Sequence, residues 1–260
     1  MNTRREFLGW MAAAVLTWGS KSAGKSGYAT GGGASVRSRW FEMGADMVPK
    51  VLDHILLGCA DLESGISFVE ARTGVKAAFG GVHPGRGTQN ALLSLGERRY
   101  LEIIAPDPKQ AAMMGPESSV ERLKLRELRE PRLVTWAAHP GRVDLLAVKL
   151  ERAGMAASGP TPGSRKRPDG KLLQWKTLNL KDDAEGLLPF FIEWSADSVH
   201  PSVDAPKGCE LKKFWVESPK AEDLRKQVGL MEIDVEVKHG ESARLRARID
   251  GPKGDMELSG

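Results

Sequence analysis

The chain has 260 residues, which is enough for one large domain or two small ones with a proper buried core. Hydrophobic residues make up 41% and charged residues 28% of the sequence, as is ordinary for a globular protein. Two cysteines, Cys59 and Cys209, exclude a disulfide scaffold and a Cys-x-x-Cys zinc or redox motif, although a single bridge between them stays open. No apolar run reaches the roughly 18 residues that a membrane span needs.

The net charge of +4 favours a nucleic-acid-binding protein until the positions of the charges are considered. Residues 1–40 hold six basic residues and one acid, a net +5, so the other residues sum to about −1. No basic stripe with interleaved aromatic residues is left outside this segment. We therefore expect no nucleic-acid partner.

The basic N-terminal segment predicts export. Arg4 and Arg5 are followed by a short apolar stretch at 7–18, and then by a Gly/Ser/Ala-rich stretch at 19–35. An apolar stretch of this length is too short to span a membrane and suits the central region of a signal peptide. The segment resembles a twin-arginine (Tat) export signal, and the alternative is a chance Arg-Arg pair before an apolar helix. The resemblance implies removal of about residues 1–34, the Tat translocase as a partner, and a periplasmic or secreted protein without a stable membrane span.

The rest of the chain begins with a β-α-β-β-β order of elements. An apolar stretch at 51–59 predicts a buried strand, and Asp61 then caps a helix that Gly74 ends. Three further strands complete this unit, and we place them at 76–80, 90–95 and 99–105.

The same order of elements then repeats. The second unit comprises a strand at 132–138, a helix at 143–153 and strands at 171–179 and 187–194. A weaker third copy comprises a strand at 211–216, a helix at 219–228 and strands near 231–238, 243–249 and 255–259. A repeated order of elements indicates one supersecondary unit used several times. We therefore predict an α+β domain at 51–200, with modules at about 51–105 and 131–194, and a C-terminal βαββ extension at 211–260.

Four short motifs give this pattern a family resemblance. They are Gly-Gly-x-His-Pro-Gly at 80–85, Arg-x-Arg-Pro-Asp-Gly at 165–170, Pro-Phe-Phe-Ile-Glu-Trp at 189–194 and His-Pro-Ser at 200–202. With the repeated units they resemble the glyoxalase type 3-like group of glyoxalase-like domains, in the vicinal-oxygen-chelate superfamily. The resemblance covers about residues 51–260. It implies paired βαβββ modules whose curled mixed sheet surrounds a cavity, plus the smaller C-terminal unit.

The resemblance also implies a divalent metal in that cavity, held by the first and last strands of each module. The matching residues are His54, Glu102 and Glu193, and the metal would be Zn²⁺, Mn²⁺, Ni²⁺ or Mg²⁺. Strand alternation places His54 and Glu102 opposite their apolar neighbours. A charge within an apolar strand needs a metal, an ion pair or a hydrogen bond, because burying it alone is costly. For Glu193 the alternative is an ion pair with Arg165 or Arg167.

The second module departs from the metal-dependent pattern. Many metal-dependent relatives carry His or Gln in its first strand, where this chain offers Thr135 or Trp136. A site of two histidines and one carboxylate for iron is therefore not visible, which weighs against an extradiol dioxygenase. His83 or His200 would complete the ligand shell or contact a ligand, and the alternative is a strand-end or loop histidine without such a role.

Several residues are candidates for binding the ligand itself. Arg165 and Arg167 lie in a Pro/Gly-punctuated segment that predicts a loop, and arginine pairs bind carboxylate or phosphate through two hydrogen bonds. The alternative is a solvated basic turn. Trp136 and Trp175 are assigned to the cavity wall, with core packing as the alternative for both, and Asn90 is also assigned to the ligand.

These assignments predict an exported protein that binds a small oxygen-rich or anionic molecule. If it is an enzyme of isomerase or lyase type, the metal would polarise a carbonyl or stabilise an enediolate, with Glu102 or Glu193 as general base. The alternative is a non-catalytic, ligand-sequestering protein of the bleomycin-resistance type. A third alternative is an interaction protein whose C-terminal unit pairs with another chain, and a homodimer stays open.

We interpret Trp194 as a core residue.

Overall fold

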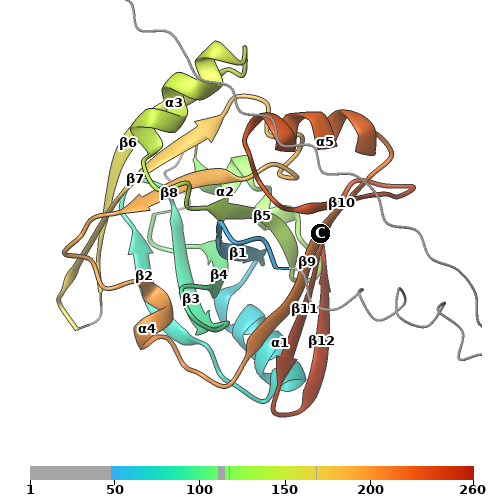
Figure 1. The fold of residues 1–260 in the computed structure, drawn as a ribbon. Helices are drawn as coiled ribbons and strands as arrows, with labels where there is room; N and C mark the ends of the chain where they lie inside the picture. Colours follow the sequence, from blue (N-terminus) through green and yellow to red (C-terminus); the bar gives the residue numbers. More distant parts are fainter. Residues whose placement is uncertain (1–47, 111–114, 117, 168) are drawn as a thin grey trace, which may run out of the picture. The chain divides into compact units, whose positions relative to one another are not determined.

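The computed structural model describes residues 48–260 except 111–114, 117 and 168 (Figure 1). The predicted export signal lies outside these residues. The described residues belong to one unit that spans 44–260.

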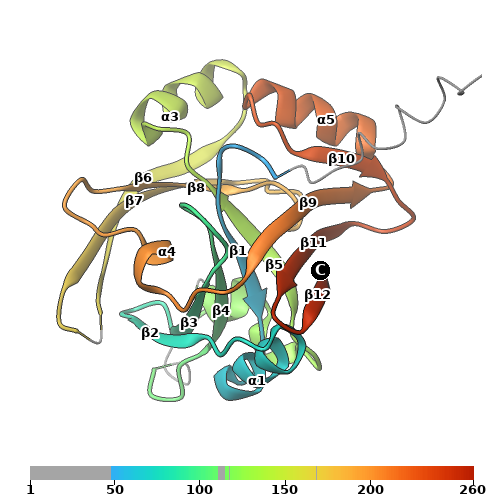
Figure 2. The ribbon, with the colours of Figure 1, turned by 60° about the horizontal axis from the view of Figure 1, so that its bottom comes forward.

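Eight strands form one large, strongly curled sheet (Figures 1 and 2). They are β1 (Leu52–Gly58), β2 (Ala78–His83), β3 (Thr88–Ser94), β4 (Tyr100–Pro106), β5 (Arg132–Ala138), β6 (Ala157–Lys166), β7 (Leu172–Leu180) and β8 (Phe190–Trp194). Their order in the sheet is β2-β3-β4-β1-β5-β8-β7-β6. β1 is parallel to β4 and antiparallel to β5, and β5 is parallel to β8. The two modules therefore join at β1 and β5, which confirms the predicted curled mixed sheet built from paired modules.

Each module carries one longer helix between its first two strands. α1 (Leu62–Thr73) and α3 (Val143–Arg152) are these helices, and two single-turn helices, α2 (Ser119–Arg122) and α4 (Pro201–Asp204), lie in the connections. The predicted ends of α1 are confirmed. The backbone N–H of Ser64 donates to the Asp61 side chain at 2.8 Å, and Gly74 ends the helix with φ of +81°.

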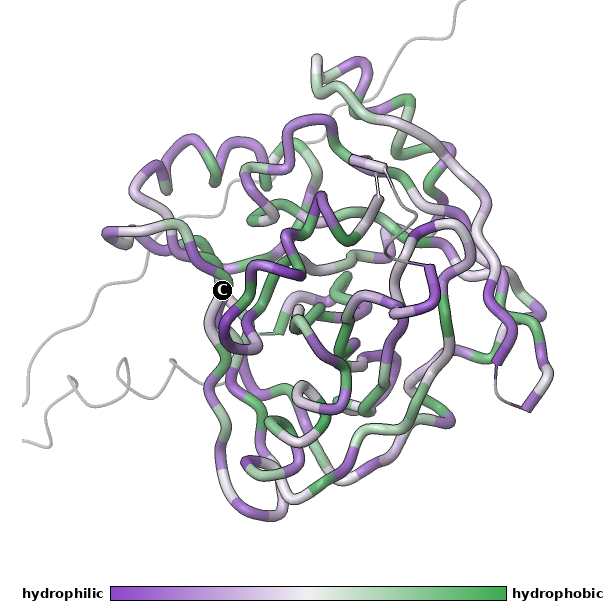
Figure 3. The backbone as a smooth tube through the Cα atoms, turned by 180° about the vertical axis from the view of Figure 1, so that it is seen from behind, coloured by the Kyte–Doolittle hydropathy of each residue, from purple (hydrophilic) through white to green (hydrophobic). Residues whose placement is uncertain are grey.

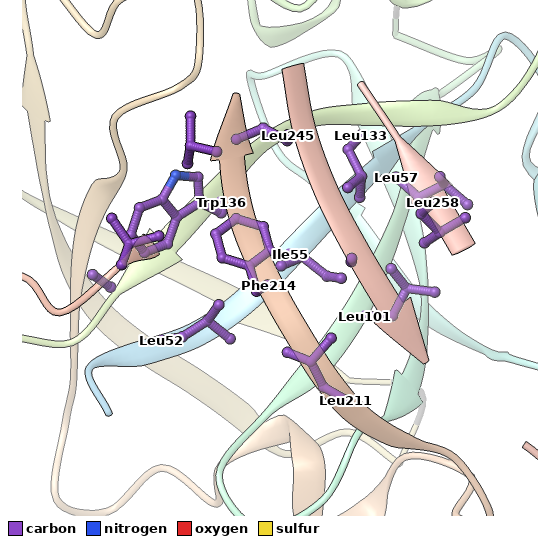
Figure 4. Close-up of a cluster of buried hydrophobic side chains, with 14 of the residues drawn as sticks. Leu52, Ile55, Leu57, Leu101, Leu133, Trp136, Leu211, Phe214, Leu245 and Leu258 are labelled. Atoms are coloured by element: carbon purple, nitrogen blue, oxygen red, sulfur yellow. The ribbon is translucent and has the colours of Figure 1, made fainter. Parts of the chain in front are cut away.

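The C-terminal unit forms a second, four-stranded sheet. It consists of β9 (Glu210–Ser218), α5 (Ala221–Leu230), β10 (Glu236–His239), β11 (Arg244–Gly251) and β12 (Gly254–Ser259), with strand order β10-β9-β11-β12. Figure 4 shows Ile55 and Leu57 of β1 packed with Phe214, Leu245 and Leu258 of this small sheet. One face of β1 is thus covered by the small sheet. The alternate positions of β1 are left for the opposite face, where the candidate functional site lies.

Trp136 belongs to this core and not to the cavity wall. Its side chain is fully buried, its ring lies 5.1 Å from the ring of Phe214, and its indole N–H donates to the Leu187 carbonyl at 2.9 Å. The assignment of Trp136 to the ligand is therefore wrong, and the alternative of core packing holds.

The segment that carries Arg165 is a strand, contrary to the predicted loop. Pro160, Pro162 and the glycines of this stretch are typical of turns, but proline is tolerated in an edge strand, where one side of the backbone needs no partner. β6 is such an edge strand. Arg165 is therefore held in regular structure with only 4% of its surface exposed, whereas Arg167 lies just beyond the strand end.

Hydrophobic and hydrophilic stretches are interspersed along the described part of the chain (Figure 3). Among the helices of the described part, none is long and apolar enough to cross a membrane. Cys59 and Cys209 are both buried free thiols, so the structure contains no bridge between them.

Candidate functional site

A cavity of about 100 Å³ is lined by strands of both modules of the large sheet. Its wall includes many of the residues singled out from the sequence. These are His54, His83, Asn90, Glu102, Thr135, Arg165 and Trp175, and they are joined by Trp194 and Thr177. The cavity therefore brings together many of the residues that the sequence predicted, but not all of them.

His54 and Glu102 face each other across β1 and β4. The Nε2 atom of His54 lies 3.4 Å from Oε2 of Glu102. The other carboxylate oxygen, Oε1, accepts a hydrogen bond from the Asn90 side-chain amide at 2.8 Å, and Nε2 of His83 lies 3.7 Å away from it. Glu102 is thus a buried carboxylate whose two oxygens both have polar neighbours.

Asp53 also belongs to this cluster, although it was not predicted from the sequence as a site residue. Its side chain is fully buried, with Oδ1 accepting from Nδ1 of His54 at 2.7 Å. Its Oδ2 accepts from Nε2 of His200 at 3.2 Å and from the indole N–H of Trp194 at 3.1 Å. Simple alternation would turn Asp53 away from His54, but the pairing of β1 with β5 shifts register between Leu52 and His54. An acid next to a histidine in an apolar strand was the only signal for it in the sequence.

The cluster sets the charges of its members. Burial alone would lower the pKa of His54, but hydrogen bonds and attraction from Asp53 and Glu102 outweigh it and raise that pKa to about 9. Burial also opposes the charge on Glu102, yet His54, His83 and Asn90 bring the pKa of Glu102 down to about 2. The pKa of Asp53 lies well below its usual range because His200 and His54 overcome the effect of its burial. Burial lowers the pKa of His83 to about 4. At neutral pH, an imidazolium at position 54 therefore lies between two carboxylates.

Arg165 brings a further positive charge to the cavity. Its Nη1 atom is buried and has no hydrogen-bond partner among the described residues, and the same holds for Oδ1 of Asn90 and Oγ1 of Thr177. All three side chains line the cavity. An unsatisfied buried polar group costs about 1–3 kcal/mol. Three such groups around one cavity indicate a polar occupant.

Two glycines of β2 make room for this guanidinium. A Cβ atom at Gly81 would lie 2.9 Å from Nη1 of Arg165, and one at Gly80 would lie 3.1 Å from it. Gly81 also has φ of +138°, a backbone conformation that other residues rarely adopt. The Gly-Gly pair of the first module therefore accommodates an arginine of the second.

The structure does not bring Glu193 to the cavity. Phe190, Ile192 and Trp194 of β8 line it, so the alternate residue Glu193 points to the other face of the sheet. There its Oε2 accepts from the backbone N–H of Val143 at 2.8 Å, at the beginning of α3. Glu193 thus satisfies a free N–H at a helix start and lies apart from both His54 and Glu102.

Arg167 also lies outside the cavity. Its guanidinium forms an ion pair with Asp204 of α4 at 2.5 Å and lies 3.4 Å from Asp169. It does not line the cavity beside His54, although it lines a smaller neighbouring pocket together with Arg165. Of the two arginines that the sequence had grouped, only Arg165 therefore reaches the cavity beside His54, and neither pairs with Glu193.

Replacing Glu193 by alanine is expected to destabilise the fold by about 1 kcal/mol, because the first turn of α3 loses its acceptor. Ligand binding should stay unchanged. Urea unfolding measures the first effect, and Glu151→Ala, an exposed change on the same helix, is the matched control. A loss of ligand affinity in Glu193→Ala would contradict this placement.

The residues present do not fit the predicted divalent metal. The second-module wall of the cavity offers Thr135, Phe190 and Ile192, which supply no imidazole or carboxylate. Within the described ranges there is no group of three or more His, Cys, Asp or Glu side chains that could hold a metal ion.

Comparison with known protein families identifies the family of the chain. A sequence model of the glyoxalase-like domain matches residues 52–229. The chain belongs to this family. The match begins at the first strand of the large sheet and runs into α5 of the C-terminal unit. No protein with a curated description matches the chain.

Several solved structures are similar to the chain. A hypothetical protein from Staphylococcus aureus is 17% identical, with a TM-score of 0.57 over 80% of this chain and 84% of that one. Methylmalonyl-CoA epimerase from Mycobacterium tuberculosis is 20% identical over 56% of this chain and 89% of its own, with a TM-score of 0.42. A hypothetical protein from Bacillus halodurans is 16% identical over 59% and 98%, with a TM-score of 0.40.

Proposed function

We propose that this glyoxalase-like protein binds a small, oxygen-rich carboxylate in the cavity, with the carboxylate against Arg165. The observation that carries the proposal is the buried Nη1 atom of Arg165, which has no partner in the described part of the chain. A guanidinium matches a carboxylate through two parallel hydrogen bonds. The unpartnered oxygens of Asn90 and Thr177 suit a ligand that also carries hydroxyl or carbonyl groups.

His54 and Glu102 line the same cavity and are placed to transfer protons to and from such a ligand. His54 carries a proton at neutral pH and would give it to a ligand oxygen, while Glu102 would take a proton from the neighbouring carbon. This exchange produces an enol, the intermediate of an isomerase or lyase. The rings of Trp175 and Trp194, 5.5 Å apart, form an apolar wall that excludes water from the bound molecule.

One observation favours a second function, the sequestering of the ligand without chemistry. The pKa of Glu102 is about 2, and a carboxylate this acidic is a weak base at neutral pH. Its oxygens are already in contact with Asn90 and His54. In this alternative the cluster only shapes the cavity and sets its charge.

Proton exchange distinguishes the two functions. The C3 protons of 2-oxobutyrate are expected to exchange in D₂O faster with the protein than in buffer, as measured by proton NMR. Glu102→Gln should abolish this exchange and retain binding, measured by titration calorimetry. Binding without exchange in the unchanged protein would favour sequestering, and the absence of binding would contradict both functions.

Divalent metals are expected to have no effect on this site. After treatment with EDTA, the melting temperature and the affinity for 2-oxobutyrate should stay the same when Zn²⁺, Mn²⁺, Ni²⁺ or Mg²⁺ is added. A metal bound to the folded state at 100 times its dissociation constant would stabilise it by about 2.7 kcal/mol, which a melting curve detects. A rise in melting temperature that is absent in His54→Ala would contradict this expectation and support a metal site at His54.

We further propose that the chain is exported through the Tat pathway, on the ground of Arg4, Arg5 and the apolar stretch that follows them. With both arginines replaced by lysine, the protein should remain in the cytoplasmic fraction of a bacterial host with that pathway. Unchanged export of this variant would contradict the proposal.

A further inference from the structure

The mouth of the cavity carries two more arginines. Arg86 lies in the connection between β2 and β3, and Arg122 lies at the end of α2, and both line the same cavity as Arg165. Both side chains are exposed. Neither side chain forms a hydrogen bond or an ion pair with a residue that the structure describes. Two guanidinium groups without a hydrogen-bond partner in the described part of the chain therefore lie beside a cavity that Arg165 also lines.

The two mouth arginines act on each other and on the cavity. Desolvation by the surrounding chain lowers the pKa of Arg122, the charge of Asp183 opposes this effect, and the charge of Arg86 adds to it. The charge of Arg86 also contributes to the lowered pKa of His83, after the larger effect of burial and alongside Arg165. Like charges repel each other. An anion placed between them relieves the repulsion and gains hydrogen bonds from both.

The charges of the site also favour an anion beside Arg86 and Arg122. The cation at His54 and the carboxylates of Asp53 and Glu102 sum to −1, and Arg165 brings the sum of these four groups to zero. Arg86 and Arg122 add two further positive charges at the mouth, and of these only the charge of Arg122 is opposed by a neighbouring acid, Asp183. A phosphate carries nearly two negative charges at neutral pH and three acceptor oxygens, which suits two guanidinium groups.

We propose that Arg86 and Arg122 form a second anion subsite, and that the ligand is a small carboxylate with a phosphate or second carboxylate at its opposite end. This inference rests on the proposed function, because it takes the first carboxylate to lie against Arg165. It adds the orientation of the ligand, with one anionic end in the cavity and the other at the mouth.

Glycerate and 3-phosphoglycerate are the probes that test it, since they differ only in the phosphate. By titration calorimetry, 3-phosphoglycerate is expected to bind at least about tenfold more tightly than glycerate, as one extra charge-assisted contact allows. The variant Arg86→Ala/Arg122→Ala should lose this advantage and keep the affinity for glycerate. Arg142→Ala/Arg152→Ala, which removes two exposed arginines at α3, is the control of equal net charge and should keep the advantage.

Every other outcome of these titrations contradicts the second subsite, the proposed function or both. Equal affinity of the two probes for the unchanged protein, or an advantage that survives in Arg86→Ala/Arg122→Ala, overturns the second subsite and leaves the proposed function intact. An advantage lost equally in the control shows a general effect of charge and also overturns the subsite. If neither probe binds the unchanged protein, the proposed function and the subsite both fail. Melting temperatures of the variants verify that all of them fold.

Discussion

Replacing Arg165 by alanine is expected to weaken the binding of glycerate by at least about 100-fold, because two charge-assisted hydrogen bonds of about 1.5–3 kcal/mol each are lost. Arg165→Lys should recover only part of the affinity, since an ammonium group cannot make the same paired contact. The melting temperature should fall by no more than truncation of a buried side chain costs, because the Nη1 atom of Arg165 has no hydrogen-bond partner to lose within the described chain. Titration calorimetry measures the affinity, and a thermal melt measures the stability.

The matched control is Arg167→Ala, two residues along the chain. Arg167 pairs with Asp204 outside the cavity, so its removal should leave glycerate binding unchanged. If both variants lost affinity equally, the effect would come from net charge near the site. If Arg165→Ala kept its affinity, the ligand carboxylate would lie elsewhere and the proposed function would be contradicted.

Asp53→Asn is expected to have the largest effect on stability. The carboxylate of Asp53 is fully buried and accepts from three donors, those of His54, His200 and Trp194. Removing its charge leaves the protonated His54 with one carboxylate fewer, and breaking a buried ion pair in this way costs about 3–5 kcal/mol. Urea unfolding at neutral pH measures the loss. The control is Asp182→Asn, a surface change, and an equal effect of both would contradict the role of Asp53.

The same cluster predicts how stability depends on pH. The pKa of His54 is about 9 in the folded protein and 6.5 without these neighbours, so its protonated form stabilises the fold. This contribution is complete below pH 6.5 and is lost as the pH rises through 9, with a total on the order of 3 kcal/mol. Urea midpoints between pH 6.5 and 9 should therefore fall in the unchanged protein. The decline should be much weaker in Asp53→Asn, and a flat profile in the unchanged protein would contradict the charge assigned to His54.

Local patterns predicted the modules, and the family resemblance predicted one half of the site. β5 occupies the predicted 132–138, because its apolar residues and flanking turn signals are local properties of the chain. His54 and Glu102 were placed together by the family resemblance, and alternation along β1 and β4 supported their common direction. The neighbouring position of these two strands was likewise part of the fold that the resemblance implies.

The second half of the site depended on contacts that sequence patterns do not contain. Both faces of β8 carry apolar residues, so the sequence did not decide whether Glu193 or Trp194 faces the cavity, and the interpretation of Trp194 as core was wrong because it lines that cavity. Trp136 is a core residue because the small sheet packs on it through Phe214, a long-range contact. The inward direction of Asp53 follows from a register shift between β1 and β5, which is set when the two modules meet.

A crystal structure of the protein with bound glycerate tests the central claim most directly. The account predicts that the ligand carboxylate lies within hydrogen-bond distance of the Arg165 guanidinium, with its C2 atom facing Glu102 and its hydroxyl groups near Asn90 and Thr177. Glycerate bound with its carboxylate away from Arg165, or bound only outside the cavity, would contradict it.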